Sequence, residues 1–191
     1  MSAELMRLLE NVLRVGVVAE ISEDGKSVRV QSGGLETTWL RWKTGRAGDF
    51  KIWCPPSLGE QVLLGCIGGN PESAILLGSL YSNENDAPSA SLKQMVVTAP
   101  DGARFEYDAE AGSLTASGMK TATIQAETKI TLDTAEVECT SHLKAKTFDF
   151  TEGGKMAGDV THTGGNLSSN GKVAHLHKHP GDSGGTTGAP I

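Results

Sequence analysis

The sequence contains few of the large apolar side chains that fill a wide hydrophobic core. Aromatic residues make up 5% of its 191 residues, and hydrophobic residues make up 38%. A sandwich of two sheets needs many aromatic and leucine side chains to fill the space between its layers. Narrow β structure needs fewer, and part of its core can come from a partner chain. We therefore expect a narrow all-β fold that other chains help to complete.

Cysteine and positive charge are also scarce. The three cysteines, Cys54, Cys66 and Cys139, are odd in number and show no C-x-x-C spacing, which argues against a disulfide framework or a thiolate metal site. We interpret them as small buried hydrophobic side chains. The formal net charge is −6. Because a phosphate backbone attracts clustered Lys and Arg, this charge argues against nucleic acid as a partner.

Signatures of catalysis, secretion and membrane insertion are missing from the sequence. It has no G-x-S-x-G or H-E-x-x-H motif. The string from Asp182 to Gly185 resembles a protease motif, but we interpret it as a turn, and Asp101 and Glu106 as solvated charges. The first 13 residues carry two glutamates and no long apolar run, so neither a signal peptide nor a transmembrane helix is predicted. We predict a protein that is made in the cytoplasm and is not an enzyme.

Apolar spacing predicts two kinds of structure in the first part of the chain. Residues 1–13 show the spacing of a short amphipathic helix with Ser2 as its N-cap; the apolar positions are Leu5, Leu8, Leu9 and Val12. Residues 14–82 contain about five to six short alternating runs, separated by turn signals such as Glu23-Asp24-Gly25. Short strands with regularly spaced turns favour a small closed barrel, and an OB-fold barrel fits best.

The chain changes character after a polar linker at residues 83–93. Residues 94–191 contain short runs with apolar residues at alternate positions, such as Ile130-Thr131-Leu132 and Phe148-Asp149-Phe150. This pattern is typical of a fibrous β-helix or β-prism. One such chain would leave strand edges unpaired, whereas three intertwined chains would pair every edge around a threefold axis. We therefore predict a homotrimeric, triple-stranded spike that ends in a tip at about residues 172–191.

Histidine is concentrated near the end of the chain. His175, His177 and His179 occupy alternate positions, so their side chains would share one face of a β-strand. His177 and His179 directly precede a Pro-Gly turn and are our first choice for a metal site, with His175 as a further candidate. Two histidines from each of three chains give six nitrogen ligands, an octahedral count that suits iron or nickel better than zinc. We expect iron, because it is the more available, and the axis leaves room for other ions.

Other interpretations stay open at this point. The three histidines could be solvated or packed residues without a metal, and we interpret His142 and His162 in that way. A metal-dependent hydrolase of cell-wall polymer or saccharide would need an open metal position and a groove. An OB-fold module could bind a ligand by stacking it on Trp39, Trp42 and Trp53, although such aromatics more often pack in a core or an interface.

Several stretches along the whole chain carry a family resemblance. They are Gln31 to Gly34, Trp39-Leu40, Arg46 to Gly48 and Pro56 to Val62 in the barrel region, Pro100 to Gly102 and Thr131 to Thr134 in the shaft, and the tail from His162 to Gly188. These residues resemble baseplate assembly protein V, the central tail spike of P2-type contractile-tailed phages and of related R-type bacteriocin particles. The tail is the longest and most specific of the matches.

The resemblance implies a mechanical role. An OB-fold collar would attach a trimeric needle to the baseplate hub and tail tube of a virion or bacteriocin particle that is assembled in the host cytoplasm. The needle would puncture the host outer membrane during sheath contraction and contact it only transiently. In the family an H-x-H motif holds a buried iron ion on the threefold axis, and here that motif falls on His177 and His179. No lysozyme domain fits between barrel and shaft, so the resemblance implies no enzymatic activity.

Overall fold

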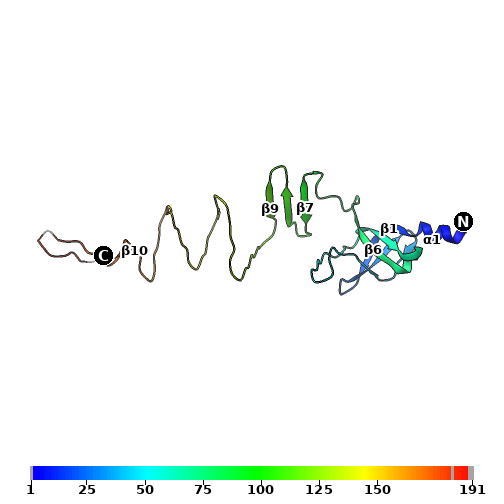
Figure 1. Cartoon of the computed structure of the whole chain (residues 1–191), viewed down its shortest axis with the longest axis horizontal. Helices are drawn as coiled ribbons and strands as arrows, with labels where there is room; N and C mark the ends of the chain where they lie inside the picture. Colours follow the sequence, from blue (N-terminus) through cyan, green and yellow to red (C-terminus); the bar gives the residue numbers. More distant parts are fainter. Residues whose placement is uncertain (1, 182, 189–191) are drawn as a thin grey trace. The chain divides into compact units, whose positions relative to one another are not determined.

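The computed structural model describes residues 2–181 and 183–188 of the chain. Asp182 and residues 189–191, which belong to the segment expected to form the tip, lie outside the described residues. The chain divides into two compact units, Met1–Gln125 and Ala126–Ile191 (Figure 1). None of the helices within the described ranges combines the length and the apolar character needed to cross a membrane.

The N-terminal helix, α1 (Ala3–Glu10), forms where the apolar spacing predicts it, although it is shorter than expected. The hydroxyl oxygen of Ser2 accepts a hydrogen bond from the backbone N–H of Leu5 at 3.3 Å, which caps one of the free donors of the first turn. Glu4 and Arg7 form an ion pair of 2.7 Å one turn apart. The helix ends at Asn11, two residues before the first strand begins.

The first unit contains the expected barrel. Its strands are β1 (Leu13–Ile21), β2 (Ser27–Ser32), β3 (Leu35–Glu36), β4 (Leu40–Arg41), β5 (Gln61–Cys66) and β6 (Ala74–Leu80), with two 3₁₀ turns, η1 (Ile67–Gly69) and η2 (Pro71–Ser73). Hydrogen bonds join them in the order β3-β2-β1-β5-β6, and β4 pairs with β2. The sheet closes where Trp42 bridges Leu76 and the backbone N–H of Lys43 donates to the Leu76 carbonyl at 2.9 Å. An all-β barrel of short strands is therefore confirmed.

Strand alternation selects the residues that enter the barrel. Every second residue of β5 is buried, beginning at Val62, and the same holds for β2 from Val28. The buried side chains form one cluster: Val18, Val28, Val30, Leu40, Val62, Leu64, Cys66, Ala74 and Leu76. Burial also raises the pKa of the Cys66 thiol. The interpretation of all three cysteines as buried is wrong for Cys54 and Cys139, which are exposed in this chain because neither lies in a strand of the barrel.

A second, smaller sheet follows a stretch without helix or strand, residues 81–93. It consists of β7 (Gln94–Thr98), β8 (Arg104–Asp108) and β9 (Ser113–Ser117) in an antiparallel meander. Apolar residues alternate along β8 at Phe105 and Tyr107, and Tyr107 lies opposite both Met95 and Leu114. All of these apolar side chains are exposed, so one face of this sheet is open.

The second unit lacks most of the strands that the sequence predicts. The alternating runs predicted as strands, including Ile130-Thr131-Leu132, contain no strand between Gly118 and Leu167. In Figure 1 this stretch runs back and forth as a plain ribbon until β10 (Ser168–Ser169), which pairs with β11 (Lys172–Val173). The physical reason is that a strand exists only beside a neighbour whose backbone groups it can bond. Successive segments of the chain between Gly118 and Leu167 do not pair with one another in this way.

Candidate functional site

The candidate site begins with a tight hairpin. β10 and β11 are joined by Asn170 and Gly171, which both adopt positive φ, 48° and 73°. Asn-Gly is the preferred pair for a two-residue hairpin turn, because both central residues need positive φ. This hairpin brings the chain back toward Leu167, whose carbonyl accepts the backbone N–H of Ala174 at 2.8 Å. The histidine segment therefore starts from an anchored point.

The three histidines do not share one strand. β11 ends at Val173, and the chain turns over residues 174–176, where the Val173 carbonyl accepts the backbone N–H groups of Leu176 and His177 at 3.1 and 3.0 Å. His175 therefore lies in a turn, and the expectation of an unbroken strand from His175 to His179 is wrong. The backbone bonds of Val173 are made within the chain, which bends it before the alternation can continue.

His177 and His179 are brought together. Their ring centroids are 5.0 Å apart, with an angle of 85° between the ring planes. The Nδ1 atom of His177 lies 2.6 Å from the Ala174 carbonyl oxygen. Because a carbonyl can only accept, Nδ1–H is the donor, and Nε2 is left with the lone pair that a metal ligand needs. A backbone hydrogen bond of this kind orients many metal-binding histidines.

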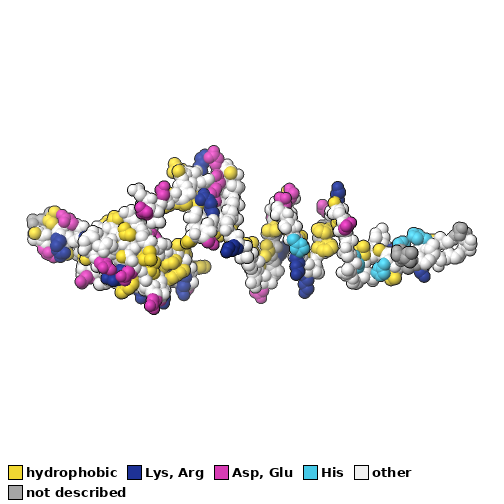
Figure 2. All heavy atoms as spheres, turned by 180° about the vertical axis from the view of Figure 1, so that it is seen from behind, with side chains coloured by type: hydrophobic (Ala, Val, Ile, Leu, Met, Phe, Trp, Pro, Cys, Tyr) yellow, Lys and Arg dark blue, Asp and Glu magenta, His cyan; other side chains and the backbone are white. Residues whose placement is uncertain are grey.

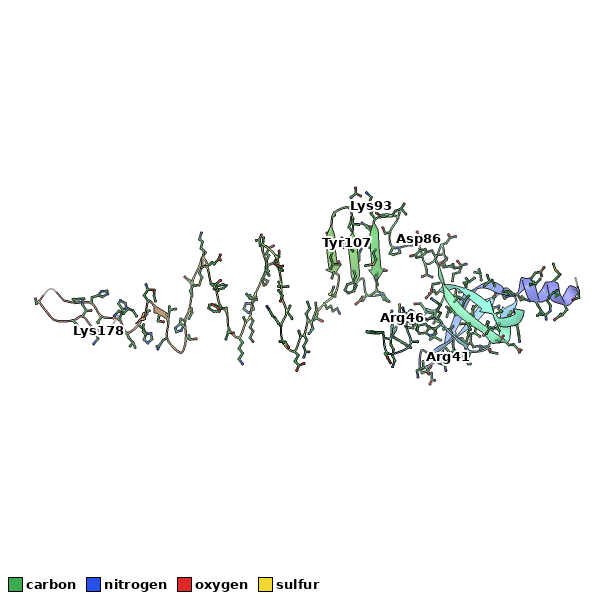
Figure 3. The ribbon with its side chains drawn as sticks, in the orientation of Figure 1. Arg41, Arg46, Asp86, Lys93, Tyr107 and Lys178 are labelled. Atoms are coloured by element: carbon green, nitrogen blue, oxygen red, sulfur yellow. The ribbon has the colours of Figure 1, made fainter. Side chains whose placement is uncertain are left out.

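A short ladder holds His179 in place. Its backbone N–H donates to the hydroxyl of Thr187 at 2.9 Å, and its carbonyl accepts the backbone N–H of Thr187, also at 2.9 Å. Pro180 bridges Thr186 beside it. Figure 2 shows the histidines, in cyan, over the second unit, and Figure 3 labels Lys178, which lies between the two candidates in sequence. The pair thus sits on a folded loop rather than on a free end.

The residues present fit a site that several chains would share. In the part of the chain that the structure describes, no group of three or more His, Cys, Asp or Glu side chains comes close enough together to hold one ion. One chain offers the pair His177 and His179, two nitrogen donors of the kind that iron accepts. A closed octahedral site would take its other ligands from further copies, so the metal ligands stay a prediction.

Apolar side chains of the second unit lie open to solvent. Phe148 is 78% exposed, and its ring stacks only on that of Phe150, with centroids 5.2 Å apart. Most other large apolar side chains of this unit are exposed too: Ile130, Leu132, Val137, Leu143, Met156, Val160, Leu167 and Leu176. A series of this length is too large to be the scattered exposure of an ordinary surface. It marks a surface that contacts something else.

The barrel carries a basic surface around two of its three tryptophans, Trp42 and Trp53. A cavity of about 450 Å³ is lined mainly by Arg41, Arg46, Lys51, Trp42 and Trp53. Figure 3 labels Arg41 and Arg46, which both project from this part of the first unit. Neither arginine forms an ion pair with any residue in the described ranges. This surface suits an anionic group.

The tryptophans do not form one stacking platform. The indole N–H of Trp42 donates to the Gly25 carbonyl at 3.1 Å, and its ring meets that of Trp53 edge-on at 5.3 Å. Trp39 instead lies under the guanidinium of Arg29, 5.9 Å from the ring centroid. Trp42 and Trp39 therefore make contacts within the barrel, and Trp53 is the most exposed of the three, at 62%.

The two carboxylates that could have suggested catalysis have structural roles. Asp101 accepts the backbone N–H of Ala103 at 3.1 Å in the turn before β8. Glu106 accepts from the Arg104 side chain at 2.8 Å and from Gln94 at 3.3 Å. Asp101 is exposed, as expected for a solvated charge. The same expectation is wrong for Glu106, whose side chain is only 22% exposed because it packs as the ion-pair partner of Arg104 on the sheet.

One apolar surface was missed from the sequence. Val15, Val17, Ile75 and Leu77 point away from the barrel core and are exposed. The signal was present in the runs Val17-Val18 and Ile75-Leu76-Leu77, where neighbouring residues are both apolar. Consecutive apolar residues on a strand mean that both of its faces are apolar, so the outer face also needs cover.

Comparison with known proteins finds a matching family for the barrel and another for most of the region that follows the second sheet. Residues 14–81 match the family described as the type VI secretion system/phage-baseplate injector OB domain, and residues 118–170 match the phage spike trimer family. The chain is 46% identical to the spike protein of Escherichia phage P2 over an alignment 203 positions long, which covers 98% of this chain and 96% of that protein. A match of this extent includes the barrel, the second sheet and the histidine loop. The chain therefore belongs to the spike protein family of P2-type phage baseplates.

Proposed function

We propose that three copies of this chain wind around one axis and form the central spike of a contractile-tail baseplate. The observation that carries the proposal is the stretch from Gly118 to Leu167, where alternating apolar residues lie exposed and the backbone forms no strand. Exposed apolar side chains are costly in water, and backbone groups that only water satisfies can be buried only if a strand partner pairs them. Two further copies would pair the backbone legs and bury the apolar side chains on the axis. The match to a family described as a phage spike trimer supports this arrangement.

The tip would be held by a metal ion. His177 and His179 from three copies supply six imidazole nitrogens, which suits one iron ion in octahedral coordination. The hydrogen bond from His177 to the Ala174 carbonyl orients that ring with Nε2 free. The bound ion would join three chain ends where a thin rod otherwise frays. His175 is a further candidate, although it lies in the preceding turn.

The proposed work of the spike is mechanical. Sheath contraction would drive the tail tube, and a narrow rod with paired backbones would concentrate that force on the host outer membrane. The barrel would connect the rod to the baseplate hub and tail tube. Neither role needs a reaction, so the protein would act without catalysis.

Native mass and metal content of the purified full chain test the proposal together. Analytical ultracentrifugation should give three times the chain mass of 20.0 kDa, and elemental analysis should give one iron per three chains. His177→Ala and His179→Ala should each abolish the iron signal, and the isolated His142→Ala serves as the matched control that keeps it. His175→Ala decides whether that residue is a ligand. A monomer would contradict the trimer, and iron retained after both changes would contradict the assigned ligands.

The particle itself provides the functional test. Particles assembled without this chain should show tails without a central tip by electron microscopy, and they should fail to infect or kill. Normal infective particles without the chain would refute the role.

A further inference from the structure

The outer face of the barrel sheet is apolar where an ordinary barrel is polar. Val15 of β1 lies opposite Leu63 of β5, and both point away from the core. Ile75 and Leu77 of β6 extend the same face and are exposed. An antiparallel sheet with one solvated face normally alternates apolar residues inside with polar residues outside. The outer face of β1, β5 and β6 departs from this pattern, and among the described residues its side chains Val15, Ile75 and Leu77 stay exposed.

Two glycines hollow out this face. Gly78 lies opposite Leu63, and a Cβ atom placed on Gly78 would find no atom within 4 Å. Gly65 lies between Leu13 and Ile75 in the neighbouring row, and the Leu77 side chain leans over it. Glycine weakens a strand, and in many sheets it marks a place where another backbone approaches closely. The face thus has apolar sides and a shallow open centre.

Helix α1 carries a second unpartnered apolar face. Leu5 and Leu9 lie on one side of the helix, Val12 follows just after its end, and all three are exposed; no residue of the helix is buried. Its anchor within the chain is the backbone of Leu8, which Gly69 of η1 approaches closely. A helix of eight residues has little stability in isolation. Such a helix is expected to gain its stability from packing.

The charges of α1 leave its apolar face uninterrupted. Glu4 and Arg7 pair with each other, and the helical spacing places both, with Glu10, on the side opposite Leu5 and Leu9. A polar outer side and a continuous apolar inner side are what a helix needs in order to cover a sheet. The helix and the outer sheet face are therefore complementary in chemistry.

Threefold symmetry requires contacts between different surfaces. In a closed ring of three identical chains, each copy presents one patch to the next copy and a different patch to the previous one. We propose that α1 of one copy packs into the hollowed outer face of β1, β5 and β6 of the neighbouring copy. This inference rests on the proposed trimer and extends it to the barrel unit. The apolar face of α1 and the outer face of β1, β5 and β6 are two different surfaces of one chain, as the contacts in such a ring require.

Cysteine cross-linking in the full chain tests the contact. The exposed native cysteines are first removed by Cys54→Ser and Cys139→Ser, while the buried Cys66 is kept. A tagged chain with Leu9→Cys is then co-expressed with an untagged chain with Ile75→Cys and treated with a short bismaleimide. We expect a covalent product between the tagged and untagged chains, and none when either variant is expressed alone. A product from Leu9→Cys alone would show the helices meeting one another, which would overturn the inference.

A blocking variant separates this contact from the trimer itself. Gly78→Trp places a large side chain in the open centre of the face, where an added Cβ atom meets no atom of its own chain within 4 Å. It should lower the yield of the mixed cross-link at least tenfold, while the native mass stays that of a trimer held by the second unit. The matched control is Gly34→Trp, which also enters open space and should leave the cross-link unchanged. If the cysteine-pair chains form a trimer but give no mixed cross-link, the helix-to-sheet contact is wrong and the proposed trimer stands. If the chain without Gly78→Trp is a monomer, the proposed trimer itself is wrong.

Discussion

Replacement of Phe148 by alanine separates a trimeric spike from a single-chain protein. In the single chain this ring is 78% exposed, so its loss should change the free energy of unfolding by no more than about 0.5 kcal/mol. A phenylalanine that is buried in a core costs about 3–5 kcal/mol when it is truncated to alanine. Each of three chains would lose it, so the trimer should be destabilised by roughly 9–15 kcal/mol.

The matched control for this prediction is Phe50→Ala. Phe50 is 85% exposed and lies in the barrel unit, outside the spike region, so it undergoes the same chemical change without loss of axial packing. Thermal unfolding of both variants can be followed by circular dichroism, with half-lives at fixed temperature as the readout if unfolding is irreversible. Phe148→Ala should unfold at a much lower temperature than Phe50→Ala. Equal shifts in the two variants would refute the axial burial of the ring.

Three further predictions concern the first unit. Leu64 is fully buried in the barrel, so Leu64→Ala should lower its stability by about 2–5 kcal/mol, measured by urea denaturation with tryptophan fluorescence; a smaller change would contradict its place in the core. Gly69 has φ 75°, and a Cβ atom there would overlap the carbonyl of Leu8, so Gly69→Ala should detach α1 and reduce the helical circular dichroism signal, whereas an unchanged signal would contradict this anchor. The N–H of Ala111, the amide of Gln94 and the N–H of Glu110 hold the pKa of Asp108 below its ordinary value of 3.8. Because the pKa of Asp108 is lower in the folded state, its ionised form stabilises the fold above about pH 4, and this stabilisation is lost as the pH falls through the folded pKa. The urea midpoint, measured at a series of pH values, should therefore fall less steeply toward acid pH in Asp108→Asn than in the unchanged chain.

The amino-acid pattern alone determined much of the barrel. The run from Gln61 to Cys66 forms β5, because its alternation requires one buried face whatever the neighbours are. Ser2 was predicted as the helix cap for an equally local reason, since its hydroxyl bonds a backbone group three residues away. The boundaries proposed for the linker and the tip stay predictions.

Only the tertiary structure decided how the histidines lie and which surfaces stay open. Alternation placed His175 on one face with His177 and His179, but hydrogen bonds to the Val173 carbonyl bend the chain and separate it from that pair. The outer apolar face of the barrel became visible only when Val15, Leu63 and Gly78 were placed side by side across three strands. Periodicity along a chain specifies which residues seek cover, because each side chain's direction follows from its local backbone. What covers them depends on strands and copies that are remote in sequence, and only their positions in space can show it.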